Sequence, residues 1–482
     1  MSDATSPAPA TPKITAADLN TFARIDVLGL QALAQQVWPD KTVLFCKPVL
    51  PDSTCPSCGA TGGWHDTFTR WFTHLPVGRA ATKLQVQAPR YRCRGCGKVW
   101  RHRLRTVAQP RSKLTRSAVW WALRQVVLDH CSISAVAAVL QTAWGTVHDA
   151  VTELGQLVLI NHPGRLEGVK VVGVDEHCWR HTHSGDKYVT VVIDLTAVRD
   201  GTGTARLLDM IEGRSKQVFK TWLDAQSPGF RAGVEIVAMD GFTGYKTATA
   251  EAVPEATTVM DPFHVVALAG DKLNRTRQRV QRELTGGRGL RNDPLYKARR
   301  LLHTGVGLLT TRQNIRLDAL FAAEEHAEVE ITWNVYQNII AAYRDKDRAA
   351  GRRALSKLID QIKAGVPKAL EELGQLGRTL HKRRDDILAF FDHPGTSNGP
   401  TEAINGRLEH LRGIALGFRN LAHYRLRSLL EAGGFRPQLH SDSKIRSVVC
   451  QAAPLGWRVM SYPRASSCWM AWFLERCGFR LA

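Results

Sequence analysis

A run of β-forming residues that ends on an acid is the feature that most constrains how this chain can fold. Residues 169 to 174 are rich in valine, and Asp175 follows them directly in the segment VVGVDEHCW. A carboxylate at the end of a buried strand is costly unless it is paired or binds a cation. The pattern therefore predicts a core strand that carries Asp175 into an ion-pair or metal site.

Two later segments complement this strand. Residues 234 to 239 form a second apolar run that ends on Asp240, and the segment SNGPTEAINGRLE begins a helical pattern with Glu402 in its first turn. Two strand-end aspartates and one helix-borne glutamate are suited to hold two divalent cations for phosphoryl transfer. We therefore expect Asp175, Asp240 and Glu402 to form one catalytic site.

Each of the three acids also has a simpler interpretation. Asp175 would form an ion pair with a nearby lysine or arginine. Asp240 would be a turn residue before Gly241. Glu402 would be an ordinary first-turn glutamate that interacts favourably with the helix dipole.

Three further acids are rival candidates for the site, and two histidines lie near these positions in the sequence: Glu176, Asp261, Glu409, His177 and His264. We expect Glu176 to face away from Asp175, because side chains alternate along a strand. Asp261 ends a later strand that could lie too far from the first. Glu409 follows Glu402 by two helical turns and is expected to support the site. The histidines are expected to be structural or supporting, because Mg²⁺ prefers oxygen ligands.

Residues 169 to 261 alternate between strand and helix patterns. Further strands are expected at Tyr188–Leu195, Ala205–Met210 and Thr257–Met260, and a helix at Ser215–Ala225. A three-stranded meander, a crossover helix and a returning strand form the ribonuclease H-like arrangement. In that arrangement the fourth strand pairs parallel to the first, which would bring Asp175 and Asp240 side by side.

The charge of the chain indicates a polyanionic partner. Its 482 residues include 65 lysines and arginines against 44 acids, which leaves a net charge of +21. Such an excess favours nucleic acid over a membrane surface. No stretch approaches the ~18 apolar residues of a membrane span, and the first residues do not resemble a signal peptide. We therefore expect a cytoplasmic protein with no membrane partner.

Four of the ten cysteines form two CxxC pairs. Cys55 and Cys58 are followed, after 34 residues, by Cys93 and Cys96. Four thiolates make a closed tetrahedral zinc site, which is structural because no coordination position stays open. Arg70–His74 and Lys83–Val86 are expected to be strands that bring the two pairs together into a zinc ribbon. Two unrelated cysteine pairs are the alternative.

The segments around this ribbon are predicted to be helical or basic. Leu19–Trp38 has helical spacing, whereas residues 101 to 116 contain six basic residues and no acid. We expect the basic segment to be an arm along DNA phosphates, with Arg101, Arg103 and Arg105 as contacts. A solvated linker is the alternative.

Three helical patterns follow, at Ala118–Leu128, Ser134–Leu140 and Thr142–Leu154. The last two resemble a helix-turn-helix in which Thr142 caps the recognition helix. The residues expected to reach the DNA groove are Trp144, Thr146 and His148. A plain three-helix bundle is the alternative.

A long helical region begins at Pro262 and continues to about residue 390. Between Asp271 and Arg300 it contains ten basic and three acidic residues, and Arg275 and Arg279 are candidate DNA contacts. Arg407, beyond Glu402, is another. The last residues, from Phe435 onward, show no clear period.

Taken in this order, the segments VVGVDEHCW, VAMDGFTGY, DPFHVV and SNGPTEAINGRL resemble the ISL-three group of bacterial insertion-sequence transposases. The resemblance covers roughly residues 40 to 440 and includes the double CxxC and the helix-turn-helix. It implies a DDE transposase in which Asp175, Asp240 and Glu402 use Mg²⁺ or Mn²⁺ to cut and rejoin DNA ends. Members of the group usually stop near Pro437, so the residues beyond it have no assigned role.

The resulting prediction is a multidomain α+β protein whose ribonuclease H-like α/β core is interrupted by an all-helical insertion. The expected parts are a disordered start (1–18), a zinc ribbon (40–105), a helix-turn-helix (112–160), the core (165–265 and 396–435), the insertion (266–395) and a C-terminal extension (436–482). Its partners would be double-stranded DNA, as terminal inverted repeats and target, and at least a second copy of the chain. The alternatives are a transposase-derived regulator without catalysis and a structure-selective nuclease.

Overall fold

The computed structural model describes residues 16–78, 80–180, 187–287 and 291–440. The chain divides into two compact units. The first contains the described residues up to Leu159 together with residues 436–440, and the second runs from Ile160 to Phe435. Most of the start predicted to be disordered, and residues 441–482 of the extension, lie outside the described residues.

A five-stranded sheet forms one half of the first unit. Its strands are β1 (Leu30–Val37), β2 (Lys41–Pro48), β3 (Gly63–Val77), β4 (Ala80–Arg92) and β5 (Val99–Arg101). The order is β1-β2-β4-β3, with β5 on β4, and β2 runs parallel to β4. The strands expected around the cysteine pairs are confirmed within β3 and β4.

The helix predicted for Leu19–Trp38 is wrong. Only α1 (Leu19–Phe22) and a short 3₁₀ turn are helical, and the rest is the edge strand β1. Leu28 and Leu30 are buried in the same apolar cluster as Leu44 of β2. Pairing with β2 therefore decides the conformation of a segment whose apolar spacing fits a helix as well.

The basic segment is folded onto this unit and is not an extended arm. Its first residue, Arg101, ends β5, and Leu104, Val107 and Ala108 are buried in the core of the sheet. Arg101, Arg103 and Arg105 themselves are exposed. The segment therefore presents its arginines from a packed loop.

Three helices complete the first unit: α2 (Arg116–Val127), α3 (Ile133–Val139) and α4 (Trp144–Gly155). They confirm the three predicted helical segments. The N-cap of α4 is Ala143, which makes no side-chain cap, so the capping role predicted for Thr142 is wrong. The short helix α18 (Arg436–His440) packs here, because Arg124 Nη1 donates to Leu439 O at 3.0 Å.

The second unit is built on a mixed sheet in the order β10-β9-β6-β7-β8. Its strands are β6 (Val171–Cys178), β7 (Tyr188–Asp194), β8 (Arg206–Glu212), β9 (Ile236–Met239) and β10 (Thr257–Met260). β9 is parallel to β6, with Val174 opposite Met239, as predicted. β6 continues beyond Asp175, which pairs with Val191 of β7, so Asp175 lies where the parallel partner stops.

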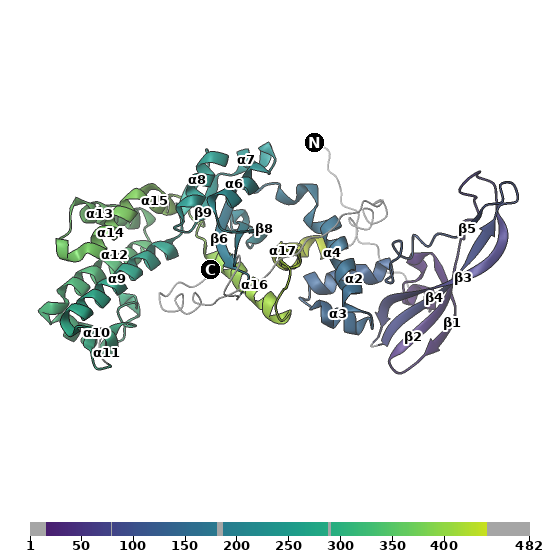
Figure 1. Ribbon diagram of the computed structural model, residues 1–482, viewed down its shortest axis with the longest axis horizontal. Helices are drawn as coiled ribbons and strands as arrows, with labels where there is room; N and C mark the ends of the chain where they lie inside the picture. Colours follow the sequence, from purple (N-terminus) through teal and green to yellow (C-terminus); the bar gives the residue numbers. More distant parts are fainter. Residues whose placement is uncertain (1–15, 79, 181–186, 288–290, 441–482) are drawn as a thin grey trace. The chain divides into compact units, whose positions relative to one another are not determined.

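Alternation along β6 separates a packing face from a polar face. Val172 and Val174 are buried in a cluster with side chains of α6 (Lys216–Asp224) and α8 (Thr243–Ala252). Asp175 instead bonds to Asn405 of α16 (Gly399–Ile414), and the next residue but one, His177, bonds to α17 (Leu421–Ala432). Figure 1 shows α6 and α8 on one side of the sheet and α16 and α17 on the other.

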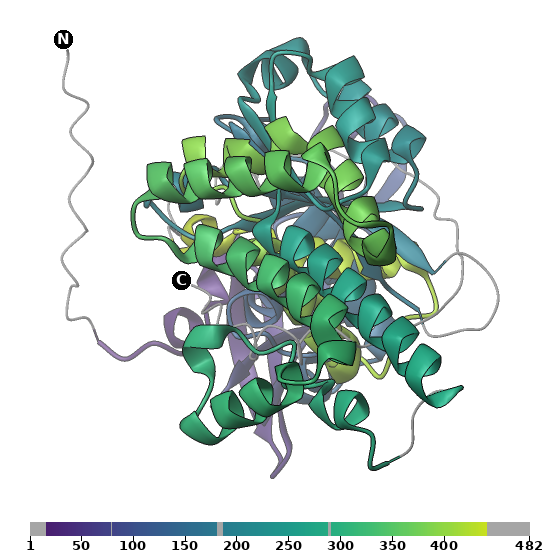
Figure 2. The same ribbon diagram turned by 90° about the vertical axis from the view of Figure 1, so that its left-hand side faces the viewer.

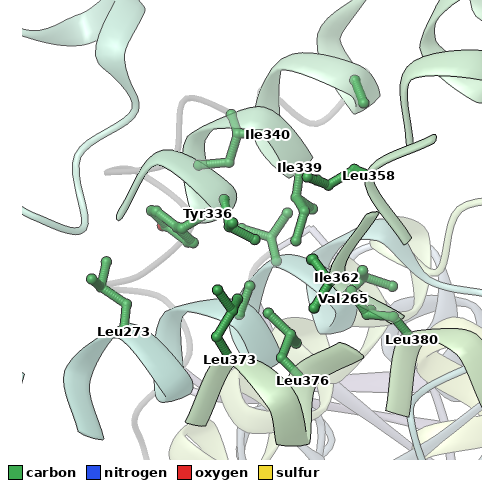
Figure 3. Packing of buried hydrophobic residues seen from close by; sticks show 14 of the residues in the cluster. Val265, Leu273, Tyr336, Ile339, Ile340, Leu358, Ile362, Leu373, Leu376 and Leu380 are labelled. Atoms are coloured by element: carbon green, nitrogen blue, oxygen red, sulfur yellow. The ribbon is translucent and has the colours of Figure 1, made fainter. Parts of the chain in front are cut away.

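Between β10 and α16 the described chain is all helical. The helices are α9 (Pro262–Thr285), α10 (Pro294–Ala298), α11 (Thr311–Phe321), α12 (Ala327–Arg344), α13 (Arg348–Ala364), α14 (Glu371–Lys382) and α15 (Arg384–Asp392). Figure 2 views this bundle from its own side. Figure 3 shows Leu273, Ile339, Leu358 and Leu376, from four of the helices, turned toward one another in its core.

Across the described ranges, no helix is both long enough and apolar enough to span a bilayer.

Candidate functional site

The two predicted aspartates meet where β6 and β9 run side by side. Asp175 is 3% exposed, and Asp240 directly follows the last residue of β9. The potential ligand atoms of Asp175, Asp240 and His264 all lie within 4.8 Å of one another. His264 comes from the first turn of α9, which begins directly after β10. The predicted proximity of the aspartates is therefore confirmed, and a histidine that was assigned a supporting role joins them.

Helix α16 supplies the remaining polar groups. Asn405 Nδ2 donates to Asp175 Oδ2 at 3.1 Å, and Glu402 lies one turn earlier on the same helix. Glu402 lies outside the 4.8 Å group, but its Oε1 is buried without a hydrogen-bond partner among the described residues. A buried carboxylate oxygen in this state is costly, and a bound cation would satisfy it.

The turn before α16 fixes where that helix begins. Asn398 is 1% exposed, its Nδ2 donates to Val174 O at 3.3 Å, and its N–H donates to Asp261 Oδ1 at 2.7 Å. A Cβ on Gly173 would lie 3.0 Å from Asn398 Oδ1 and 2.7 Å from Ile193 Cγ1. Glycine at position 173 thus leaves room for Asn398 to join the strand to the helix.

Mutual repulsion and burial act on the acids in the same direction. Burial raises the pKa of Asp175 well above its usual range, and the charges of Glu402 and Asp240 raise it further. Burial likewise raises the pKa of Glu402, with a contribution from Asp261. Clustered buried carboxylates of this kind favour either protonation or a bound cation. The donor set therefore fits a divalent metal.

His264 experiences the same field with the opposite sign. Burial lowers its pKa, but the adjacent Asp261 carboxylate and the charges of Asp175 and Asp240 outweigh burial and raise the pKa to about 9. Its Nδ1 lies 3.4 Å from Asp261 Oδ2. The imidazole therefore lies among the carboxylates of Asp175, Asp240 and Asp261.

Asp261 belongs to this cluster, contrary to the expectation that it could lie too far away. It is 4% exposed, caps α9 through Phe263 N, and accepts the Asn398 N–H. Because β10 pairs in parallel with β9, Asp261 follows the strand next to the one that Asp240 follows. Asp261 thus joins the first turn of α9 to the turn before α16, which indicates a supporting role.

The other neighbours lie where they were expected. Glu176 pairs with Arg214 at 3.0 Å, away from Asp175. His177 Nε2 is 2.9 Å from the Tyr424 hydroxyl oxygen, and burial lowers the pKa of His177 to about 3. Glu409 Oε1 lies 3.8 Å from His177 Nε2 and also binds Arg412. These contacts are structural.

The four cysteines of the first unit form a second cluster. Cys55 Sγ is 3.6 Å from Cys96 Sγ, Cys58 Sγ is 3.5 Å from Cys93 Sγ, and Cys58 Sγ is 3.7 Å from Cys96 Sγ. A tetrahedral zinc with Zn–S bonds of ~2.3 Å requires S···S separations of about 3.8 Å. The Cys96 N–H donates to Cys93 Sγ and lowers the pKa of the Cys93 thiol, which favours the thiolate. The spacing fits a closed zinc site.

Glycines follow both pairs in the conformation that the turns need. Gly59 and Gly97 have φ of 73° and 70°, and their N–H groups donate to Cys55 O and Cys93 O. A left-handed φ favours glycine at these two positions.

The three candidate contacts on α4 differ in exposure. Trp144 is 50% exposed and Thr146 is half-buried, but His148 is only 5% exposed. The His148 ring stacks on Trp144 at 4.6 Å, and its Nδ1 lies 3.0 Å from Asp149 Oδ1. A direct base contact by His148 does not fit this burial, because its ring packs against Trp144.

The arginine candidates also divide into engaged and available groups. Arg279 binds Glu372, Glu328, Glu283 and the Ala369 carbonyl. Because its guanidinium already binds several acceptors, Arg279 joins helices of the bundle and is not a free DNA contact. The prediction that Arg279 contacts DNA is therefore wrong.

The remaining candidate arginines are more exposed than Arg279. Arg275 is largely exposed and pairs with Asp271 at 2.8 Å. Arg407 is exposed on α16, and Arg101 lies over the Phe68 ring at 5.3 Å.

Comparison with known proteins assigns the family. The family model of ISL3-type DDE transposases matches residues 172–428. Since this match covers more than half of the 482 residues, the chain belongs to the ISL3 transposase family. The match confirms the resemblance drawn from the sequence. Transposases of this kind are DNA-cleaving and strand-transferring enzymes.

Two similar insertion-sequence transposases agree with this assignment. The transposase for insertion sequence element IS1557 of Mycobacterium tuberculosis is 25% identical over 416 residues, covering 80% of this chain and 87% of that protein. The transposase for element IS1001 of Bordetella parapertussis is 26% identical, covering 81% and 92%. The Drosophila P element transposase strand transfer complex aligns with a TM-score of 0.36 at 9% identity, over 68% of this chain and 92% of that one.

Proposed function

We propose that this transposase cuts and joins DNA with divalent cations held by Asp175, Asp240 and Glu402. The observation that carries the proposal is the convergence of Asp175, Asp240 and His264 within 4.8 Å, beside a buried Glu402 oxygen that has no partner among the described residues. Mg²⁺ or Mn²⁺ bound there would activate the attacking water or 3′-hydroxyl and stabilise the leaving oxygen. Asp175, Asp240 and Glu402 would supply the carboxylate ligands for these cations.

The hydrogen bonds around Asp175 support this role. Its Oδ1 accepts from the Glu176 N–H at 2.8 Å, and its Oδ2 accepts from Asn405 Nδ2. A carboxylate oxygen has two lone-pair sites, so each oxygen keeps one for a cation. Asn405 therefore orients the carboxylate without consuming it.

The arrangement of the second unit supports a ribonuclease H-like core. The antiparallel meander β6-β7-β8 is followed by α6, and β9 returns parallel to β6. The helices α9 to α15 would then be the insertion before the residue that completes the site. The same reading assigns the first unit to a zinc ribbon and a helix-turn-helix that bind terminal inverted repeats.

Joining two DNA ends requires at least two catalytic sites, so we propose a homodimer or higher oligomer on DNA. Because its substrate would be DNA, we propose that the protein acts at the bacterial nucleoid, in the cytoplasm. The positive charge of the chain would hold the phosphate backbone of the repeats and the target.

A strand-transfer assay tests this function. The purified protein is incubated with Mg²⁺, a labelled duplex that carries the element's own terminal repeat, and a supercoiled plasmid. A transposase nicks at the repeat end and joins the new 3′-hydroxyl to the plasmid. A structure-selective nuclease would cut without joining, and a regulator would bind the repeat and do neither.

The histidine in the acidic cluster leads to a prediction about metal preference. Imidazole nitrogen binds transition metals better than Mg²⁺, so His264→Ala is expected to weaken Mn²⁺ binding about 10-fold and to affect Mg²⁺ binding less. Calorimetric titration of both metals checks this. His177→Gln is the control, because His177 is buried near Asp175 but bonds to Tyr424. An unchanged ratio of Mn²⁺ to Mg²⁺ affinity in His264→Ala would contradict the prediction.

A further inference from the structure

The last helix of the bundle brings a buried ion pair to the edge of the acidic cluster. Helix α15 packs against β10, and Arg383 and Asp386 lie at its start. They are 4% and 2% exposed, and Arg383 Nε donates to Asp386 Oδ2 at 2.5 Å. The sequence separates this pair from Asp240 by more than 140 residues, and neither residue is among the predicted site residues.

Arg383 reaches the loop that carries the second catalytic aspartate. Its Nη1 donates to the carbonyl oxygen of Gly241 at 3.0 Å, and Gly241 follows Asp240 directly. Asp240 Oδ1 in turn accepts the Phe242 N–H at 2.8 Å, which ties the carboxylate to the same turn. The guanidinium therefore holds the peptide on which the orientation of Asp240 depends.

Asp386 fixes the guanidinium against two further elements. Its Oδ1 accepts from Thr258 Oγ1 of β10 at 2.7 Å and lies 2.9 Å from Lys246 Nζ of α8. One carboxylate thus joins α15 to the strand beside β9 and to the helix that follows Asp240. The strand β10 and the helix α8, which both neighbour the turn, are therefore bound by one side chain of the helical bundle.

Stability alone is a weak reason for a pair of this kind. Desolvation offsets most of the attraction in a buried ion pair, and apolar residues of similar volume often replace such pairs at no cost in stability. Geometry is a better reason, because the planar fork of arginine binds two acceptors at fixed angles. Here those acceptors are the Asp386 carboxylate and the Gly241 carbonyl.

We infer that the Arg383–Asp386 pair is a positioning element through which the helical bundle holds Asp240 in its cation-binding orientation. This inference rests on the proposed function of the acidic cluster. It gives the bundle a second task besides any contact with DNA: the metal site is complete only when α15 is docked.

The test separates positioning from folding. In the double variant Arg383→Met with Asp386→Leu, the apolar pair should keep the fold, while Asp240 loses its support. We expect Mn²⁺ binding, measured by electron paramagnetic resonance on the full chain, to weaken about 10- to 100-fold. The half-saturating Mn²⁺ concentration for nicking should rise by a similar factor, with the unfolding temperature retained.

A matched control lies one residue further along the helix. Arg384 pairs with Asp360 of α13 on the surface of the same bundle. The variant Arg384→Gln with Asp360→Asn should leave Mn²⁺ binding unchanged, because it has no contact with the Asp240 turn.

Each outcome decides the inference. Wild-type Mn²⁺ affinity in a folded Met/Leu variant would overturn it. If that variant does not fold, Arg383→Lys decides: a folded Lys variant with weaker Mn²⁺ binding supports the inference, and one with wild-type binding overturns it. If Asp175→Ala binds Mn²⁺ as tightly as the wild type, the metal site of the proposed function fails instead.

Discussion

Replacing Asp175 with alanine is expected to reduce both nicking and joining of DNA by roughly 10⁴-fold, in the range seen when one member of a catalytic unit is removed. Asp175 is the most buried of the three acids and occupies the point where the two parallel strands end their pairing. Without it, the acidic cluster loses its most buried carboxylate ligand. Single-turnover rates on a labelled repeat-end duplex measure the loss, and binding of that duplex should persist.

The control for this variant is the adjacent residue. Glu176→Gln changes a carboxylate on the same strand that pairs with Arg214 on the opposite face, and activity should remain near that of the wild type. Asp240→Ala and the double variant with Asp175→Ala should be about as inactive as Asp175→Ala alone, because the acids act as a unit. Multiplying losses would show that the two aspartates act independently.

Replacing Cys58 with serine is expected to remove the zinc and unfold the first unit. Zinc in small structural sites contributes about 10 kcal/mol or more of apparent folding free energy at neutral pH. The four cysteines join the segment before β3 to the segment after β4, and this connection is lost without the metal. Metal analysis should fall from about one zinc per chain to none, and a chelator should reproduce the loss of structure in the wild type.

Cys131 provides the comparison, because it lies in the same unit but outside the cluster. Cys131→Ser should keep its zinc and its fold. Full zinc content in Cys58→Ser would refute the tetrahedral assignment. Joining of a pre-nicked DNA end to a plasmid should fall by a smaller factor than repeat binding, since the acidic cluster lies in the other unit.

The core strands could be predicted because their signals are local. Apolar runs that end on Asp175 and Asp240, and Ser215 as the cap of α6, specify strand and helix without knowledge of distant partners. Leu30–Val37 could not be assigned in this way. Its apolar spacing fits both a helix and a strand, and only the pairing with β2 decides between them.

The supporting residues of the site were beyond reach for a related reason. Asn405 contacts Asp175 across 230 positions, and Asn398 contacts Val174 across 224. In the sequence both are ordinary turn or helix residues. Arg279 shows the converse, because its basic neighbourhood suggests DNA, while its partner Glu372 lies 93 positions away. Long-range partners decide what such polar side chains do.

The position of Asn398 also determines when the enzyme becomes competent. The strand that carries Asp175 is complete by residue 178, yet the turn and helix that orient this acid begin only at Asn398. A chain leaves the ribosome from its N-terminus, and its domains fold as they emerge. The first unit's sheet and helices α2 to α4 can therefore form long before the acidic cluster closes. A growing chain therefore completes the sheet of its first unit early and the acidic cluster last, so the proposed cleavage has to wait until the polypeptide is nearly whole.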